Sequence, residues 1–451
     1  MIAILIAASA ALQPFVKVEA PALVLDHVRV IDGTGVPPRD DQTVCIAQGR
    51  FAASCPPNAQ HLDLRGRTVM PGLVGMHDHL FYPMGGGIFS EMARSFPRLY
   101  LAAGVTTIRT AGSVEPYTDL ELKKNIDQGQ EAGPKIHVTG PYLEGKGSFA
   151  LQMHAIQDPE DARRTVAFWA GQGVTSFKAY NTLTRAELGA AIDEAHKHKL
   201  KLTGHLCSIG FTEAARLGID NLEHGLVVDT EFFSKKEPDK CPNPRAAAEE
   251  LAKMSPDDPR LATLIRELVQ RHVAVTSTLA VFDSITEAGW KRALTQPVLD
   301  ALSEDTKTRL LSAHASGRDT TVWNTLVKLE MEFEHRFAKA GGMLIAGCDP
   351  TGNGTTLAGY GDFRDVELLV EAGFTPLEAL KIHSLNGAQW LGVADRIGSI
   401  APGKEADLVV LDGDPSQRIA DIEKVEIVFK DGVGYDPQKL AASVRGLVGD
   451  R

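Results

Sequence analysis

The sequence predicts an α/β protein: a (β/α)8 TIM barrel that carries a small β-sandwich built from both chain ends. Eight short β-prone runs alternate with helical patterns through the middle of the chain. Side chains able to bind a metal follow the ends of several of these runs. The chain also has 451 residues, more than one hydrophobic core normally serves, which favours a large domain plus a smaller one.

The first residues include an apolar stretch at positions 2–12 that is too short to span a bilayer. Small residues at 8–10 and the run Val-Glu-Ala at 18–20 are candidate cleavage sites, so we predict a signal peptide within residues 1–20. The positively charged residues that usually begin a signal peptide are missing, so the alternative is an N-terminus without a targeting role. A signal peptide predicts export to the periplasm, and its absence predicts a cytoplasmic protein.

Both ends of the chain are rich in short β-prone runs that end in turn residues. Residues 21–70 contain such runs, separated by turns such as Asp32-Gly33. Residues 396–440 contain ADLVVLDGD and KVEIVFKDG, each closed by an Asp-Gly turn. We therefore predict one β-sandwich domain from residues 21–70 and 396–440, and a barrel domain from residues 71–395.

The barrel segment contains eight strand candidates with helix starts between them. The predicted strands lie within 69–76, 105–111, 135–143, 174–180, 201–207, 221–225, 273–282 and 342–349. Asp158 before Pro159 predicts an N-cap, and Thr184 and Thr375, each followed three residues later by Glu, predict capping boxes. Strands that alternate with helices in this way favour a parallel barrel.

Six potential metal ligands lie at or just past the ends of these runs. They are His77, His79, Lys178, His205, His224 and Asp349. A barrel enzyme keeps its chemistry at the carboxyl ends of its strands, so the six side chains are expected to meet there. Each residue alone is weak evidence, but their joint placement predicts a metal site.

The residue types suit two divalent ions. His77 and His79 are two positions apart and point the same way, so both can reach one ion. His205 and His224 fall on adjacent strands and can share a second ion. A lysine ammonium has no lone pair, but Lys178 carboxylated by CO2 offers oxygen ligands that can bridge two ions. A salt-bridged or rim lysine is the alternative for Lys178.

Two ions that share a hydroxide provide a strong nucleophile at neutral pH. Asp349 beside that water can take its proton and later return it to a leaving group. Zinc is the expected metal because imidazole and carboxylate suit it, with manganese or cobalt as alternatives.

Several motifs together resemble the amidohydrolase superfamily in its binuclear-metal form, over nearly the whole chain. The motifs are PGLVGMHDHL (71–80), GHL (204–206), NLEHG (221–225), GCDPTG (347–352) and IGSIAPGKEADLVVLDGDP (397–415). GHL, NLEHG and the run FKAY (177–180) are most similar to the branch that contains imidazolonepropionase-like proteins, prolidase-like dipeptidases and N-acyl-amino-acid hydrolases.

The resemblance implies a role for each ligand. It implies that His77 and His79 bind the first ion, that carboxylated Lys178 bridges, and that His205 and His224 bind the second ion. It also implies that Asp349 ligates the first ion and acts as general base and then acid.

Other side chains near the strand ends are weaker candidates. Tyr142 and Tyr180 end two strands and could polarise a substrate carbonyl, although core or rim tyrosines are the alternative. Arg109 could hold a substrate carboxylate or form a structural salt bridge.

The five cysteines contain no C-x-x-C pair, which makes a thiolate zinc site improbable. Cys45 and Cys55 could pair across a hairpin in an oxidising compartment. Cys207 and Cys348 are predicted to be small packing residues, because they alternate away from the ligands along their strands.

These features predict a hydrolase that cleaves an amide bond with a metal-bridging hydroxide. The predicted substrate is a peptidyl or N-acyl amino acid, as for a dipeptidase or carboxypeptidase-like amidase. A hydrolase of cyclic amides or of aryl esters and carbamates is the alternative, and a non-catalytic scaffold fits less well because all six ligand positions are filled.

Charge and composition limit the partners. A net charge of −11 argues against nucleic acid or an anionic membrane, and no other stretch predicts a transmembrane helix. The expected partner is a small amide or peptide, and the chain could also form a homo-oligomer. Residues 228–262, called the insertion below, are polar and proline-rich and either cover the active site or form a surface excursion.

Overall fold

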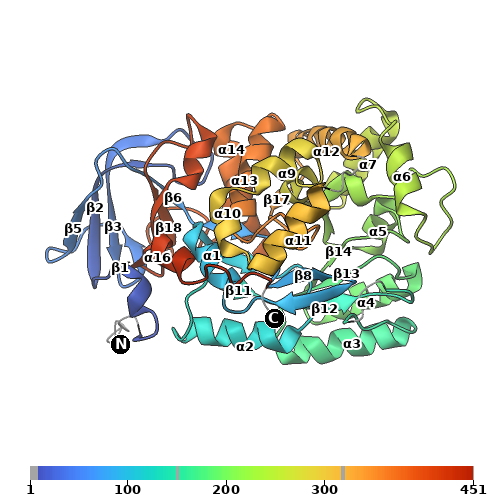
Figure 1. Cartoon of the computed structure of the whole chain (residues 1–451), viewed down its shortest axis with the longest axis horizontal. Helices are drawn as coiled ribbons and strands as arrows, with labels where there is room; N and C mark the ends of the chain where they lie inside the picture. Colours follow the sequence, from blue (N-terminus) through green and yellow to red (C-terminus); the bar gives the residue numbers. More distant parts are fainter. Residues whose placement is uncertain (1–8, 149–151, 316–319, 450–451) are drawn as a thin grey trace.

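The computed structural model describes residues 9–148, 152–315 and 320–449, and it is a mixed α/β fold (Figure 1). The first eight residues of the predicted signal peptide lie outside the described residues. Parallel strands occupy the middle of the chain, while the two chain ends meet in a separate, mostly antiparallel sheet.

Each of the eight predicted barrel runs contains parallel strand. The strands are β7 (Leu73–Gly75), β10 (Val105–Arg109), β11 (Lys135–His137), β12 (Thr139–Leu143), β13 (Ser176–Ala179), β14 (Lys201–Gly204), β15 (Asn221–Glu223), β16 (Ala274–Ser277) and β17 (Leu344–Ala346). They form one sheet in the order β11-β10-β7 and another in the order β12-β13-β14-β15-β16-β17. β11 and β12 together fill the single run predicted at 135–143.

Backbone hydrogen bonds connect the first and last of these strands. The Met76 amide donates to the Ala346 carbonyl over 2.8 Å, and the Asp349 amide donates to the His77 carbonyl over 2.9 Å. A Cβ at Gly347 would lie 2.2 Å from the His77 nitrogen, so only glycine fits here. The bonds bring His77 beside Asp349, although they are far apart in sequence.

One predicted strand is too long. The run 273–282 was expected to be extended throughout, but β16 ends at Ser277 and the helix α8 (Leu279–Asp283) follows. A continuous apolar run fits a buried strand and a buried helix equally well, which explains the error. The correction matters because Phe282 therefore lies on a helix beside the strand ends.

The chain ends form one nine-stranded sheet in the order β1-β20-β19-β18-β6-β2-β3-β4, with β5 paired to β2. Its strands are β1 (Val16–Val18), β2 (Ala22–Val30), β3 (Arg39–Ala47), β4 (Arg50–Ala52), β5 (Gln60–Asp63), β6 (Thr68–Pro71), β18 (Leu408–Leu411), β19 (Val425–Lys430) and β20 (Val433–Tyr435). β6 and β18 pair directly, which joins the two ends of the chain.

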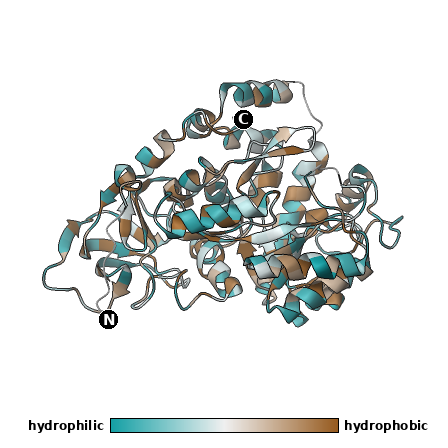
Figure 2. Cartoon of the chain, turned by 90° about the horizontal axis from the view of Figure 1, so that it is seen from below, coloured by the Kyte–Doolittle hydropathy of each residue, from teal (hydrophilic) through white to brown (hydrophobic). Residues whose placement is uncertain are grey.

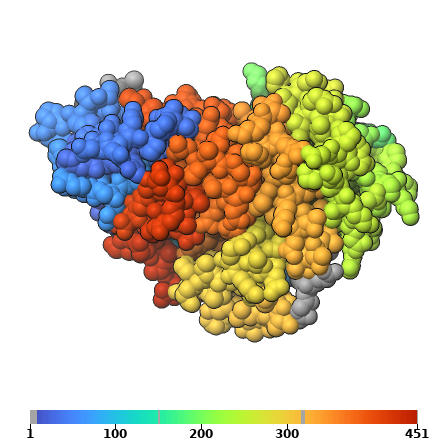
Figure 3. Space-filling model, turned by 90° about the horizontal axis from the view of Figure 1, so that it is seen from above, coloured from blue at the N-terminus to red at the C-terminus, as the bar shows by residue number. Residues whose placement is uncertain are grey.

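This sheet has a hydrophobic core of its own, in which Leu25, Val69, Leu408 and Phe429 are fully buried. In Figure 3 its blue N-terminal part lies at one end of the molecule, and the yellow-green segment that includes the insertion lies at the other. The domain boundaries and the two-layer sandwich stay predictions. β1 falls inside the predicted signal peptide, yet it pairs with β20.

The described residues also form α-helices, several of which contact the parallel strands. They are α1 (Phe96–Ala102), α2 (Pro116–Asp127), α3 (Pro159–Gln172), α4 (Arg185–Lys197), α5 (Phe211–Leu217), α6 (Pro244–Leu251), α7 (Pro259–Gln270), α8, α9 (Glu287–Ala293), α10 (Gln296–Ala301), α11 (Glu304–Ala315), α12 (Thr321–Lys339), α13 (Tyr360–Glu371), α14 (Pro376–Lys381), α15 (Gly387–Leu391) and α16 (Pro437–Ala442). The outer helices carry both brown hydrophobic and teal hydrophilic residues in Figure 2, as expected for helices with one packed face.

The predicted helix starts are confirmed. Asp158 accepts a hydrogen bond from the Asp161 amide before α3, and Thr184 and Thr375 form capping boxes before α4 and α14. Within the described ranges, none of these helices has both the length and the apolar character needed to cross a bilayer.

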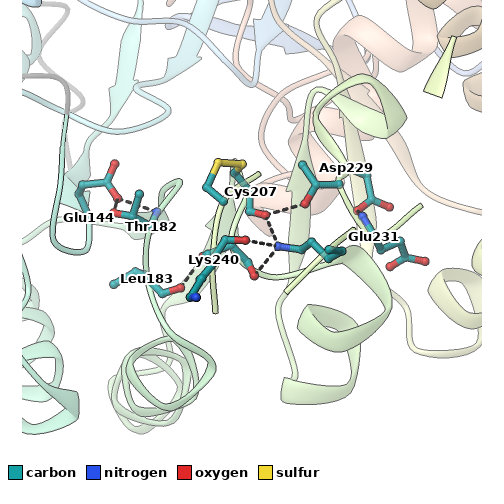
Figure 4. Close-up of a disulfide and its surroundings, with 11 residues drawn as sticks. Glu144, Thr182, Leu183, Cys207, Asp229, Glu231 and Lys240 are labelled. Atoms are coloured by element: carbon teal, nitrogen blue, oxygen red, sulfur yellow. Dashed lines mark hydrogen bonds between the residues drawn. A yellow bond between two sulfur atoms is a disulfide. The ribbon is translucent and has the colours of Figure 1, made fainter. Parts of the chain in front are cut away.

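Two disulfides are present. Cys45 pairs with Cys55, one of the outcomes that the sequence left open. The prediction for Cys207 was wrong, because it pairs with Cys241 of the insertion rather than serving only as a packing residue (Figure 4). Cys348 is buried and unpaired. The insertion itself contains α6 and the start of α7, and its first part is tied to the end of β14.

Candidate metal centre

His77 and His79 lie just past the end of β7, and both are buried. His77 Nδ1 is 2.8 Å from Glu223 Oε2, and His79 Nδ1 donates to the Gly112 carbonyl over 3.1 Å. A neutral imidazole whose Nδ1–H bonds an oxygen keeps its lone pair on Nε2. Both Nε2 atoms face the same group of side chains: Lys178 Nζ is 2.9 Å from that of His77, and Asp349 Oδ1 is 3.5 Å from that of His79.

His205 and His224 follow β14 and β15 directly. Their ring centroids are 4.4 Å apart, and the His224 ring is also 4.4 Å from that of His77. Thr278 Oγ1 lies 2.8 Å from His224 Nδ1. The four imidazoles therefore form one continuous cluster, in which His224 connects His77 of the first predicted pair to His205.

Asp349 faces three of the histidines. Its Oδ2 lies 3.8 Å from His77 Nε2 and 3.8 Å from His224 Nδ1, in addition to the contact with His79. The ligand atoms of His77, His79 and Asp349 all lie within 4.8 Å of one another, close enough to share one ion.

The backbone is strained at two of these positions. His224 has φ +69° and Asp349 has φ +46°, a left-handed conformation that non-glycine residues rarely adopt. Such strain costs about 1–3 kcal/mol and persists where the surroundings fix it, often at functional sites. Here it turns both side chains toward the cluster.

The protonation states suit metal binding. Burial lowers the pKa of all four histidines, and the neighbouring positive charge of Lys178 lowers the pKa of each further. Neutral imidazoles are the form that binds metal, so the donor set of nitrogens and a carboxylate fits a divalent ion such as zinc. Burial also lowers the pKa of Lys178 to about 8.

A buried ion pair that the sequence analysis missed holds His77. Glu223 bonds His77 through one oxygen and Arg109 Nη2 through the other, over 2.7 Å. Burial alone would raise the pKa of Glu223, but Arg109 and His77 hold it well below the usual value. Arg109 is fully buried, so of its two interpretations the structure supports the structural salt bridge. The only sequence signal was the position of Glu223 at the end of a strand, next to His224.

The two tyrosines lie at the edge of the cluster. Tyr142 Oη is 3.4 Å from His79 Nε2, and the Tyr180 ring contacts the His205 ring at 4.8 Å. The rings of Tyr142 and Tyr180 are 5.0 Å apart. Burial raises the pKa of both hydroxyls, which keeps them protonated and able to donate a hydrogen bond.

The structure thus brings all six predicted ligands and both tyrosines to one place at the carboxyl ends of parallel strands. Such a site defines a candidate centre for divalent metal ions. Residues 68–434 match the model of the Amidohydrolase family, and the chain belongs to this family.

Relatives of known sequence or structure agree with that assignment. An imidazolonepropionase from Porphyromonas gingivalis is 24% identical over 411 residues, 86% of this chain and 85% of that protein. A structure of a candidate prolidase from Bifidobacterium longum superposes with a TM-score of 0.68 at 27% identity, covering 92% of this chain and 94% of that one. An adenine deaminase from Moorella thermoacetica is 30% identical over 148 residues, 32% of this chain, but the chain covers only 23% of that protein.

Proposed function

We propose that the protein is a metal-dependent hydrolase of amide C–N bonds, built on a closed (β/α)8 barrel. The observation that carries the proposal is the convergence of four neutral imidazoles, Lys178 and Asp349 in one buried cluster. Two divalent ions bound there, with zinc as the first choice, would activate water and polarise the substrate carbonyl.

The chain's own residues would divide the tasks. His77, His79 and Asp349 would hold the first ion, and His205 and His224 the second. Lys178 is suited to carboxylation because a pKa near 8 leaves part of its amine neutral at pH 7, and a neutral amine adds to CO2 with loss of a proton. The resulting carbamate would bridge the two ions.

Asp349 is the proposed general base and acid. It would accept the proton of the attacking water and then pass it to the departing nitrogen. In this proposal the protonated hydroxyls of Tyr142 and Tyr180 would donate hydrogen bonds to the substrate carbonyl oxygen, where negative charge develops.

The proposed substrate is a peptidyl or N-acyl amino acid, and the likeness to the candidate prolidase at 27% identity supports it. A cyclic amide is the second candidate, because the imidazolonepropionase matches over 86% of the chain.

The two disulfides support export to an oxidising compartment such as the periplasm. The proposed partners are thus small molecules, with homo-oligomers left open.

A substrate screen tests the proposal. Zinc-loaded wild-type protein is assayed against N-acyl amino acids and dipeptides, cyclic amides, and aryl esters, with Asp349→Asn as the control. We expect turnover of open-chain amides, lowered about 10²–10⁴-fold in Asp349→Asn. Turnover of cyclic amides alone would favour the second candidate, and turnover that survives Asp349→Asn would contradict the role of Asp349.

A further inference from the structure

A cavity of about 650 Å³ opens beside the candidate metal centre, with His205 in its wall. We call it the apolar cavity. Its size falls within the range of pockets that enclose a whole small ligand. It lies between the residues that follow β15, the helix α6 of the insertion, α8 and the start of α12.

Two aromatic rings form the wall that leads away from the metal centre. Phe282 contacts the ring of His224 edge-on at 5.7 Å. On its other side Phe282 stacks on Trp323 at 5.7 Å, with the ring planes 15° apart. A substrate group held against these rings would therefore extend directly from the proposed position of the scissile bond.

The other apolar side chains of the wall are aliphatic. Val227 and Val228 follow β15, and Ala247, Ala248 and Leu251 face the cavity from α6. The disulfide between Cys207 and Cys241 also lines the cavity and fixes the chain three residues before α6 begins.

A lysine reinforces the same attachment. Lys236 donates to the Cys207 and Ser208 carbonyls over 2.8 and 2.7 Å, and to the Lys240 carbonyl over 2.6 Å. The insertion is therefore held in place as a wall of the cavity.

The cavity wall has few ionisable side chains, and the Oδ2 atom of Asp229 is buried without a hydrogen-bond partner. Asp229 is buried, accepts a hydrogen bond from the Glu231 amide over 3.0 Å, and has its pKa raised well above the usual value by burial. Arg245 points to solvent and pairs with Glu249 over 2.8 Å. Besides His205, these are the ionisable side chains among the described residues of the wall, so the interior favours an uncharged group.

We propose that the apolar cavity receives a bulky apolar substituent, aryl or long alkyl, attached to the scissile amide. The proposal rests on the proposed function and narrows its substrate class to hydrophobic amides. Small polar dipeptides would leave the aromatic rings of the wall in contact with water. Each methylene buried in such a wall strengthens binding about fourfold.

Binding to the Asp349→Asn protein tests the proposal without turnover. Isothermal titration compares N-acetylglycine with N-butanoyl- and N-octanoylglycine, and a second series compares N-acetylglycine with N-acetyl-leucine and N-acetyl-tryptophan. The first series extends the acyl side of the amide and the second the amine side. We expect at least one series to tighten by tenfold or more from its smallest to its largest member.

Variants locate the effect. Trp323→Ala and Val228→Asp, each added to Asp349→Asn, should remove most of the gain. Trp290→Ala is the matched control, because this tryptophan is also half-buried but stacks on His314 outside the apolar cavity. Unchanged melting temperatures verify that the variants fold, and the milder Trp323→Leu replaces Trp323→Ala where they do not.

Two results would overturn the proposal: equal affinity along both series, or a gain that survives both cavity variants. Failure of the proposed function gives a different result. In that case the wild-type protein hydrolyses none of these amides, while the preference in binding and its loss in the variants persist.

Discussion

The strand ends that carry the candidate metal centre and the insertion that lines the cavity beside it hold their residues by different means. On the strand side, His77 is fixed by a buried ion pair of Glu223 and Arg109 within the parallel sheet. On the insertion side, the wall of the apolar cavity is fixed by a disulfide and by hydrogen bonds to Lys236. The proposed chemistry therefore rests on the parallel strands, while the proposed specificity rests on an attached segment that can vary independently.

Glu223→Gln should have the largest effect, because it breaks the buried ion pair that fixes His77 on the strand side. The substitution leaves Arg109 as an uncompensated buried charge, so the free energy of unfolding should fall by about 3–5 kcal/mol. Loss of the carboxylate behind His77 should also weaken zinc binding about 10–100-fold. Urea denaturation and a competitive zinc titration measure the two effects.

The matched control is Glu121→Gln, which removes an exposed carboxylate paired with Lys124 and should change stability by less than about 0.5 kcal/mol. Zinc affinity that stays at the wild-type value in Glu223→Gln would give Glu223 a structural role alone.

Cys241→Ser should act on the insertion side. The disulfide closes a loop of 34 residues, so its loss should lower the free energy of unfolding by up to about 4 kcal/mol. Zinc content should not change, but the preference for N-octanoylglycine should fall, because α6 loses its attachment beside the cavity.

Cys45→Ser removes the other disulfide, in the sheet of the chain ends, and serves as the control. It should also lower stability, by up to about 3 kcal/mol, while the binding preference stays intact. An equal loss of preference in both variants would mean that the Cys207–Cys241 bond has no special part in the cavity.

The convergence of the six candidate ligands was predictable from sequence, because each lies at or just past the end of an apolar run and these runs end at the same edge of parallel strands. Glu223 was not, because its partner Arg109 is 114 residues away and a glutamate beside a histidine has no distinctive pattern. The Cys207–Cys241 pair depends on the path of the insertion, and Phe282 on where an apolar run changes from strand to helix. Such features follow from tertiary contacts, which local sequence does not contain.

Lowering the pH should also reduce the free energy of unfolding, through a histidine buried behind the parallel strands. His383 is fully buried behind β7 and β17, where burial lowers its pKa to about 4, and Asp362 Oδ1 lies 3.4 Å from its Nε2. Below pH 6.5 the folded state therefore binds fewer protons than the unfolded state. The neutral histidine makes its full contribution to the free energy of unfolding above pH 6.5, and this contribution is lost as the pH falls toward 4.

The free energy of unfolding should fall by at most about 3 kcal/mol through this histidine. Urea denaturation between pH 4 and 7 measures it, and the pH dependence should be smaller in His383→Gln than in the wild type. His196→Gln changes an exposed histidine and should keep the wild-type slope; the same slope in all three proteins would contradict the assignment.

The metal content of the purified protein is the sharpest test of the proposed two-ion centre. After zinc loading and dialysis, inductively coupled plasma mass spectrometry should find about two ions per chain in the wild type and in His196→Ala, and fewer in His77→Ala. A wild-type protein that binds no zinc, manganese or cobalt, or a His77→Ala variant with an unchanged count, would contradict a metal centre at these residues.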